Sequence, residues 1–457
     1  MSTALRSSEI LQRRPTLREN FGWALTGRVV FAACQWGNLA ALAKLGTSEM
    51  VGQYALGMAV SMPVILFLRF KLRIVLATET GDGATFIRCV RLTIINTIIA
   101  LLVIGTIGLL FEHESVFFII ALTALFLACE SFSELAYGLF QQQECMDRIT
   151  KSLVTRGTLT LAALSITLYI TQDLVVAVTA MLAAAAIVLV GYDMALVRLT
   201  RREARQGSME QGLYREVFSF GLSEIRSLAP LLLAVLPLGI GVLVGSLGNS
   251  IPRYFLHGLH GAPALGVFAA IAGLMAPGNV IARSLSEATI ARLARDFAAG
   301  DVAGFRRLIF KLLGIVTLVG ACGLAVAFSA GDFILTMLYT PEYAGHPWAL
   351  MILMTAAAMG LIGAVFGTAV FAMRKYWIPL PTNVFSLLVV FTVSFFCVDS
   401  LGLTGAALAV LTGNLARVFI LGGVAASTGR GNIAPFVRRV LVDRNVHRSV
   451  DDGTKPM

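Results

Sequence analysis

Twelve apolar stretches make up most of this chain, and they constrain its fold more than any other feature of the sequence. Each stretch has about 20 or more mostly apolar residues, the length that an α-helix needs to cross a bilayer. Only 14% of the 457 residues are charged, against roughly 25% in a typical soluble domain. The sequence therefore predicts an all-α polytopic membrane protein. The predicted spans are 21–45, 51–72, 88–111, 117–141, 152–171, 174–197, 217–246, 263–290, 308–338, 347–373, 377–398 and 402–427.

Lysine and arginine residues lie almost entirely on one side of these predicted spans. They follow the even-numbered spans and flank both termini, whereas only Lys44 and Arg253, of 36 basic residues, fall near the other side. Cytoplasmic loops carry the excess of basic residues in membrane proteins. We therefore expect both termini to be cytoplasmic, and we interpret the run 247–262, which contains Arg253, as a loop on the outer face.

A long polar segment divides the predicted spans six and six. We expect two six-helix lobes, with both the polar segment and the terminal segments in the cytoplasm. The predicted parts are an N-terminal segment 1–20, an N-lobe 21–198, a linker 199–216, a C-lobe 217–427 and a basic tail 428–457.

The two halves share a local pattern at an offset of 214 residues. Spans two and eight therefore look like copies, as in transporters built from parallel repeats. Each proline of the pattern is predicted to kink its helix, because proline removes a backbone donor. Chance similarity stays open, since glycine and proline are common in membrane helices. The matched pairs include Gly52 and Gly266, Pro63 and Pro277, and Arg69 and Arg283.

Several charged residues lie inside the predicted spans, where a charge is costly unless it faces a partner or water. The charged residues that lie deepest inside the spans fit either buried structural ion pairs or a hydrated cationic cavity. Near the cytoplasmic ends, arginines can extend to the interface, and we expect Asp193 and Glu287 to pair with neighbouring arginines there. The deep residues are Arg28, Glu130, Glu134, Glu224, Arg226 and Arg417, and Arg69, Arg156 and Arg283 lie near the cytoplasmic ends.

A cationic cavity suits a phosphate-bearing headgroup, because guanidinium groups match phosphate geometry and stay charged. Paired carboxylates nearby would suit proton or cation coupling, since two close carboxylates perturb each other. Our candidates for substrate binding are Arg28, Arg69, Arg226, Arg253, Arg283 and Arg417. The candidates for ion coupling are Glu130, Glu134 and Glu224.

The sequence contains no pattern for catalysis or metal binding. It has no GxSxG motif and no Walker loop, and its six cysteines and five histidines lack metal-ligand spacing. We therefore expect neither an enzyme nor a bound metal or cofactor. The net charge of +10 is explained by anionic lipid headgroups at the cytoplasmic face, so no nucleic-acid partner is expected.

Three runs carry a resemblance to a known family: 248–255 (GNSIPRYF), 265–272 (LGVFAAIA) and 72–78 (LRIVLAT). They resemble the Wzx-type oligosaccharide flippases of the multidrug/oligosaccharidyl-lipid/polysaccharide exporter (MOP) superfamily. The resemblance implies two six-helix bundles in a V around a central cavity. Twelve spans, not fourteen, distinguish the chain from lipid II flippases of the MurJ type.

The resemblance also implies a function and partners. Such a protein would move undecaprenyl-diphosphate-linked oligosaccharide across the bacterial inner membrane by alternating access, for O-antigen, capsule or exopolysaccharide. Family members are thought to use a cationic lumen and an ion gradient, and Arg28 and Arg226 are the best matches to lumen arginines. The implied partners are the lipid-linked substrate, membrane lipids, a polysaccharide polymerase and a chain-length regulator.

Two alternative functions stay open from the sequence. A small-molecule efflux antiporter of the related drug-exporter branch would use Glu130 or Glu134 for coupling. A membrane polymerase or ligase of the same pathway would need chemistry on an outer loop, and only 247–262 combines an arginine with two histidines.

Overall fold

The computed structural model describes residues 17–78, 83–110, 114–204 and 222–427. All the regular elements among these residues are helices. They are α2 (Leu17–Leu45), α3 (Ser48–Leu68), α4 (Leu72–Thr78), α5 (Gly83–Gly108), α6 (Glu114–Gln142), α7 (Met146–Thr171), α8 (Leu174–Val188), the π-helical turn η1 (Leu189–Asp193), α9 (Met194–Ala204), α11 (Leu222–Gly273), α12 (Ala276–Ala298), α13 (Val302–Leu338), α14 (Pro341–Ala344), α15 (Pro347–Ala372), α16 (Pro379–Leu401) and α17 (Leu403–Ser427).

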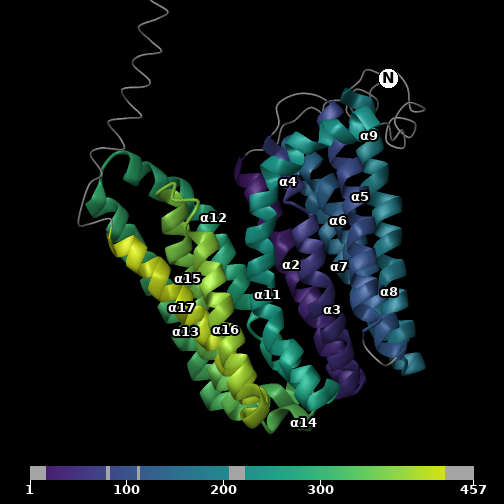
Figure 1. The fold of residues 1–457 in the computed structure, drawn as a ribbon, viewed down its shortest axis with the longest axis vertical. Helices are drawn as coiled ribbons and strands as arrows, with labels where there is room; N and C mark the ends of the chain where they lie inside the picture. Colours follow the sequence, from purple (N-terminus) through teal and green to yellow (C-terminus); the bar gives the residue numbers. More distant parts are fainter. Residues whose placement is uncertain (1–16, 79–82, 111–113, 205–221, 428–457) are drawn as a thin grey trace, which may run out of the picture.

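The helices form two bundles arranged in a V (Figure 1). The N-bundle consists of α2 to α9, and the C-bundle consists of α11 to α17, with α11 on the side that faces the N-bundle. The bundles meet near α14 and diverge towards α4 and α9 (Figure 1). We call these the α14 end and the α4 end. Helix α3 packs more extensively against α11 than any other two helices pack together in the described residues.

The outer surfaces of the bundles are apolar. Large side chains such as Phe328 and Leu110 are about four-fifths exposed, which suits helices surrounded by lipid rather than water. Nine helices of the described residues are long and apolar enough to cross a membrane. The chain is a multi-pass membrane protein. Helices overlap all twelve predicted stretches, but the number of crossings and the side of the termini stay predictions, and residues 1–16 and 428–457 lie outside the described residues.

The predicted outer loop at 247–262 is wrong. Helix α11 continues through this run and first leaves helical geometry at Gly261, with φ of 80°. Gly, Asn, Ser and Pro in the run are turn signals in water, but an unpaired backbone inside a bilayer is so costly that the helix persists. Arg253 therefore lies in a helix, eight residues before the break, or about 12 Å at 1.5 Å per residue.

The two repeat prolines have different roles in the structure. Pro63 lies inside α3, as predicted, and is buried. Pro277 does not kink a helix, because the helix is already interrupted at Leu274 and Met275 and Pro277 belongs to the first turn of α12. Proline is favoured there, since the first turn of a helix needs no internal backbone donor.

The repeat glycines meet at the contact between the bundles. A Cβ atom on Gly52 would lie 1.8 Å from the carbonyl oxygen of Ala262, and one on Gly266 would lie 1.8 Å from the carbonyl oxygen of Ser48. Ser48 and Ala262 are 214 residues apart in the sequence, and so are Gly52 and Gly266. Each half thus makes the same contact with the other, as in an isologous interface, and the backbones approach too closely for any side chain.

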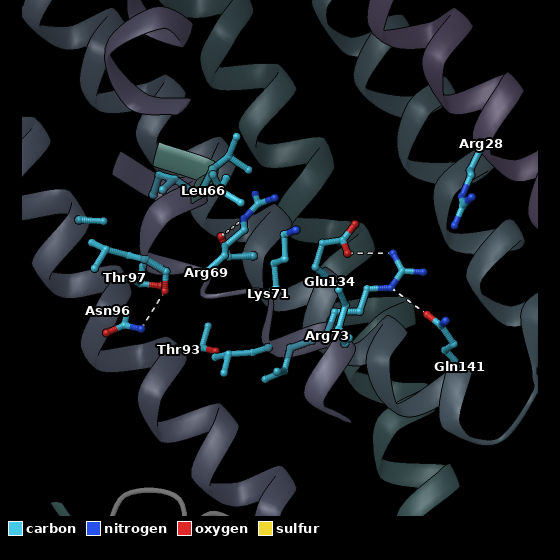
Figure 2. A pocket seen from close by; sticks show the side chains of 18 of the residues that line it. Arg28, Leu66, Arg69, Lys71, Arg73, Thr93, Asn96, Thr97, Glu134 and Gln141 are labelled. Atoms are coloured by element: carbon cyan, nitrogen blue, oxygen red, sulfur yellow. Dashed lines mark hydrogen bonds and ion pairs between the residues drawn. The ribbon is translucent and has the colours of Figure 1, made fainter. Parts of the chain in front are cut away.

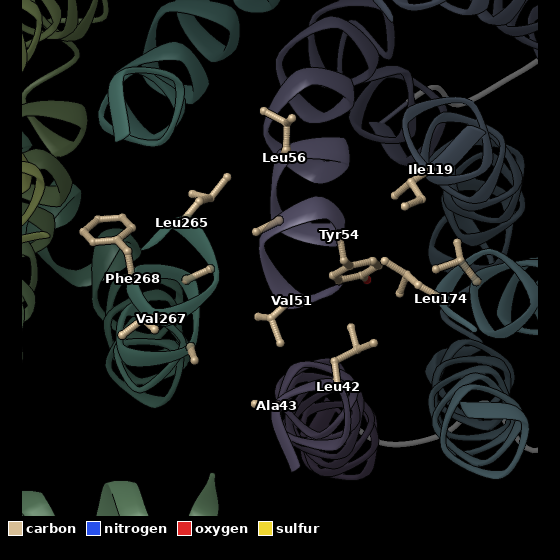
Figure 3. Packing of buried hydrophobic residues seen from close by; sticks show 14 of the residues in the cluster. Leu42, Ala43, Val51, Tyr54, Leu56, Ile119, Leu174, Leu265, Val267 and Phe268 are labelled. Carbon is tan, nitrogen blue, oxygen red and sulfur yellow. The ribbon is translucent and has the colours of Figure 1, made fainter. Parts of the chain in front are cut away.

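Apolar side chains surround this backbone contact. Figure 3 shows Leu265 and Phe268 of α11 on one side of α3, and Ile119 and Leu174 of the N-bundle on the other. The buried cluster that includes them extends through both bundles. Lys44 of α2 adds a polar contact, donating to the carbonyl oxygen of Met337 at 2.9 Å. The α14 end is therefore a continuous core shared by the two bundles.

Candidate functional site

A cavity of about 480 Å³ lies towards the α4 end (Figure 2). Its walls come mainly from α3 to α6, with one charged residue from each of α2 and α12. Basic, acidic and amide side chains project into it from these walls. The polar residues that line it include Arg28, Arg69, Lys71, Arg73, Thr93, Asn96, Thr97, Ser131, Glu134, Gln141 and Glu287.

An interruption between α3 and α4 supplies three of the basic residues. Phe70 and Lys71 both have positive φ angles, 44° and 52°, a conformation that is uncommon for residues other than glycine. Phe70 is buried with 2% exposure, and the carbonyl oxygen of Leu68 accepts a hydrogen bond of 2.8 Å from Asn96 Nδ2. The break turns the backbone so that Arg69, Lys71 and Arg73 all line the cavity.

Arg69 is held in place by the neighbouring helix α6. Its Nε donates to Ser131 Oγ at 2.8 Å, and its Nη2 donates to the carbonyl oxygen of Leu127 at 2.9 Å and to Glu130 Oε2 at 3.0 Å. Charge-assisted bonds of this kind are stronger than neutral ones. Arg69 therefore has a fixed position and a compensated charge.

Arg73 is held by the next turn of the same helix. Its Nη1 donates to Glu134 Oε2 at 2.9 Å and its Nε donates to Gln141 Oε1 at 3.2 Å, as Figure 2 shows. Its guanidinium also lies over the ring of Tyr137, 5.6 Å from the centroid. Glu130 and Glu134, predicted to couple ions, thus both bind arginines in the structure, which favours the ion-pair interpretation that the sequence left open.

Lys71 differs from the arginines around it. Its side chain is exposed in the cavity, and no acidic residue among those described forms an ion pair with it. It stands between Arg69 and Arg73 in the sequence and between Arg69 and Glu134 in Figure 2. Lys71 is therefore the cation of this wall that is ready for an external anion.

Arg28 reaches the cavity from α2 and binds across it to the other bundle. Its Nη1 donates to Glu287 Oε2 on α12, and both side chains line the cavity. The expected pairing of Glu287 with an arginine is confirmed, although that arginine belongs to the opposite bundle. The cavity is therefore closed on one side by an ion pair that joins the two bundles.

A second polar cluster is buried inside the N-bundle. Asp193 is fully buried, and its Oδ1 accepts a hydrogen bond of 2.6 Å from Ser152 Oγ. Because this bond uses the Ser152 proton, Tyr137 Oη donates to Ser152 Oγ, at 2.7 Å. Arg156, 2% exposed, lies between the rings of Phe31 and Tyr137, 5.2 and 5.7 Å from their centroids.

This buried cluster corrects two expectations. Asp193 does not pair with an arginine at the interface, and Arg156 does not extend to the membrane surface. No ion pair joins them in the described chain, and the three guanidinium nitrogens of Arg156 have no hydrogen-bond partner there. Asp193 ends a π-helical turn, and the extra residue of such a turn rotates the side chain that follows. A regular helical pattern therefore could not place it.

The structure places only some of the predicted substrate-binding arginines together. Arg28 and Arg69 line the cavity, whereas Arg253 and Arg417 do not. Arg417 lies beside α11, where its Nη2 would be 3.5 Å from a Cβ on Gly248. The other predicted residues, Arg226, Glu224 and Arg283, belong to α11 and α12, but their side chains lie outside the described residues.

Sequence reasoning missed Lys71 and Arg73 as site residues. Both stand at the end of the second predicted span, 51–72, where basic residues were interpreted as markers of topology. The available signal was their spacing with Arg69, which puts three basic residues in a five-residue segment. In a continuous helix Arg69 and Arg73 would share a face and Lys71 would point to the opposite side, so all three can line one cavity only because the helix breaks.

Comparisons with known proteins agree with this architecture. No family model matches the chain. A capsular polysaccharide biosynthesis protein, CapF of Staphylococcus aureus, is 24% identical over 397 residues, covering 86% of this chain and 95% of that protein. An inward-facing multidrug resistance MATE family transporter of the MOP superfamily aligns with a TM-score of 0.67 at 14% identity, over 89% of this chain and 98% of that one.

A second solved structure has a different substrate. The lipid II flippase MurJ, in an inward closed conformation, aligns with a TM-score of 0.64 at 12% identity, over 94% of this chain and 93% of that one. The chain has the MOP superfamily fold. The resemblance found in the sequence is confirmed at this level, and these structural relatives are transporters and flippases, not enzymes.

Proposed function

We propose that the protein is a flippase of the bacterial inner membrane that moves undecaprenyl-diphosphate-linked oligosaccharides from the cytoplasmic to the periplasmic leaflet. The observation that carries the proposal is the cavity at the α4 end, where Lys71 has no acidic partner among the described residues and Arg28, Arg69 and Arg73 stand around it. A diphosphate is the anion that such a set of donors fits best.

The size and place of the cavity support the same substrate. A volume of about 480 Å³ falls in the range of about 300–1,000 Å³ that holds ligands of drug size, which is enough for a diphosphate and an adjoining sugar. The α4 end is the end that the basic residues predict to be cytoplasmic, the side from which such a substrate enters. The relative CapF is a capsular polysaccharide biosynthesis protein.

Complementation of a deletion strain tests the proposal. We expect the wild-type chain to restore surface polysaccharide, and a chain carrying both Arg28→Ala and Lys71→Ala to reach the membrane but leave lipid-linked oligosaccharide to accumulate inside. A variant chain with Lys151→Ala, which removes an exposed cation of an N-bundle pair outside the cavity, is the matched control. Normal polysaccharide with the double variant would contradict the assignment, and altered drug resistance with intact polysaccharide would favour an efflux antiporter.

A further inference from the structure

The ion pair between Arg28 and Glu287 occupies a place where a substrate anion would also bind. Both residues line the cavity that contains Lys71 and Arg73, and Figure 2 shows the Arg28 side chain pointing towards the side of the cavity where Arg73 lies. A carboxylate bound to a guanidinium presents the same kind of acceptor oxygens as a phosphate group. Glu287 therefore resembles a ligand that the chain itself supplies.

This ion pair is the most exposed of the three that involve cavity arginines. The side chains of Arg28 and Glu287 are 32% and 47% exposed, against 18% and 17% for Arg69 and Glu130. The pair of Arg73 and Glu134 lies between them at 21% and 30%. Exposed pairs are weak because water and salt screen them, so an external anion displaces Glu287 more readily than Glu130 or Glu134.

We propose that Glu287 is an internal competitor that holds Arg28 until the phosphate groups of the substrate headgroup replace it. The inference rests on the proposed function, since it concerns the headgroup of that substrate. When the headgroup displaces the Glu287 carboxylate from Arg28, a contact between α2 and α12 is lost, because this ion pair joins the two bundles. Headgroup binding thus also releases a contact that holds the bundles together at the open side of the cavity.

Competition with Glu287 for Arg28 favours ligands that carry more than one negative charge. A monoanion such as a single carboxylate offers Arg28 no more than Glu287 already does, and it must give up its own hydration. A diphosphate contacts Lys71 and Arg28 at once and offers oxygens to a planar guanidinium in a bidentate way. Glu287 therefore sets a threshold that favours doubly charged headgroups over singly charged anions.

The experiment measures binding of inorganic pyrophosphate to the purified full chain by calorimetry. Glu287→Gln should tighten binding between about 1.5-fold and 5-fold, the range that corresponds to an exposed ion pair. Glu287→Asp keeps the negative charge but shortens the side chain, so it should also tighten binding. Asp147→Asn breaks the exposed pair with Lys151, which lies outside the cavity, and should change nothing.

A double-variant cycle separates displacement from a general change in charge. In an Arg28→Ala chain, adding Glu287→Gln should not tighten pyrophosphate binding further, because Arg28, the residue for which Glu287 and the ligand compete, is absent. A gain that persists without Arg28 would overturn the inference, and so would unchanged or weaker binding in both Glu287 variants. If the wild-type chain does not bind pyrophosphate at all, the proposed function fails together with the inference, whereas binding without a Glu287 effect removes the inference alone.

Discussion

Two arginines beside the cavity in the N-bundle and two arginines of the C-bundle are accommodated differently. In the N-bundle, Arg69 and Arg73 each bind a glutamate and at least one more acceptor on α6. In the C-bundle, the Nε atoms of Arg253 and Arg417 are buried without a hydrogen-bond partner in the described chain. A donor left unsatisfied costs roughly 1–3 kcal/mol, more when it is charged. Arg69 and Arg73 therefore stabilise the fold, whereas Arg253 and Arg417, like the buried Arg156 of the N-bundle, are kept at a cost to stability.

This difference shows that the number of arginines in a bundle says little about where an anion binds. Glutamates of α6 neutralise the cavity arginines Arg69 and Arg73, and among the described residues of this wall the cation left for a ligand is Lys71, in the break after α3. Pairing and exposure, not count, locate the candidate site. Four tests, with five substitutions in all, probe the comparison, and they are ordered from the largest expected effect to the smallest.

The substitution Arg69→Ala should have the largest effect on stability. It removes three hydrogen bonds and leaves Glu130, which is 17% exposed, without its counter-ion. Breaking a buried pair in this way costs about 3–5 kcal/mol, with the lower value expected for a pair that is partly exposed. Thermal unfolding in detergent, followed by size-exclusion chromatography, measures the loss. A melting temperature equal to that of the wild type would show that the N-bundle pairs do not support the fold.

The substitutions Gly52→Ala and Gly266→Ala test the one place where the bundles are alike. Each new methyl group would overlap a carbonyl oxygen of the other half, and overpacking typically costs about 1–3 kcal/mol. We expect similar losses from both, measured by the same thermal unfolding in detergent. Gly105→Ala is the matched control, since nothing lies within 4 Å of a Cβ there. Strongly unequal effects would mean that the reciprocal contact is not equally important to the two halves.

The substitution Lys71→Ala should weaken pyrophosphate binding by up to about fivefold, the scale of an exposed charge contact, with little change in stability. Lys71 has no ion pair in the described chain, so its removal leaves no acid uncompensated. The matched control is Lys151→Ala. Retention of full affinity would show that the paired arginines, not Lys71, bind the anion.

The substitution Arg417→Leu should have the smallest effect on stability, and the change is expected to be neutral or slightly stabilising. It replaces a guanidinium that has a buried, unsatisfied Nε with an apolar side chain, and such replacements of buried charges are often neutral or favourable. The thermal unfolding measurement used for Arg69→Ala allows direct comparison. A loss as large as that of Arg69→Ala would mean that Arg417 and Arg69 do not differ in the way described.

The membrane-spanning helices were predictable because a bilayer requires long apolar segments with internally bonded backbones. The same requirement explains the main error, since it keeps Arg253 in a helix where Gly, Asn, Ser and Pro suggested a loop. The site was only partly predictable. Arg28 and Arg69 were identified from their depth and spacing, but depth does not reveal partners: Glu287 comes from another helix 259 residues away. The exposure of Lys71 depends on a backbone break that no residue pattern announced.

The reciprocal contact between Gly52 and Gly266 also bears on the origin of the chain. In a dimer of identical six-span subunits, a residue on the two-fold axis meets its own copy, so one substitution changes both sides of the contact. The present contact keeps that arrangement, although the residues after each glycine have diverged to Gln-Tyr and Val-Phe. It points to an ancestral homodimer whose single gene was duplicated and fused after the glycine was already in place. Relatives in which the two positions vary independently of each other would argue against this history.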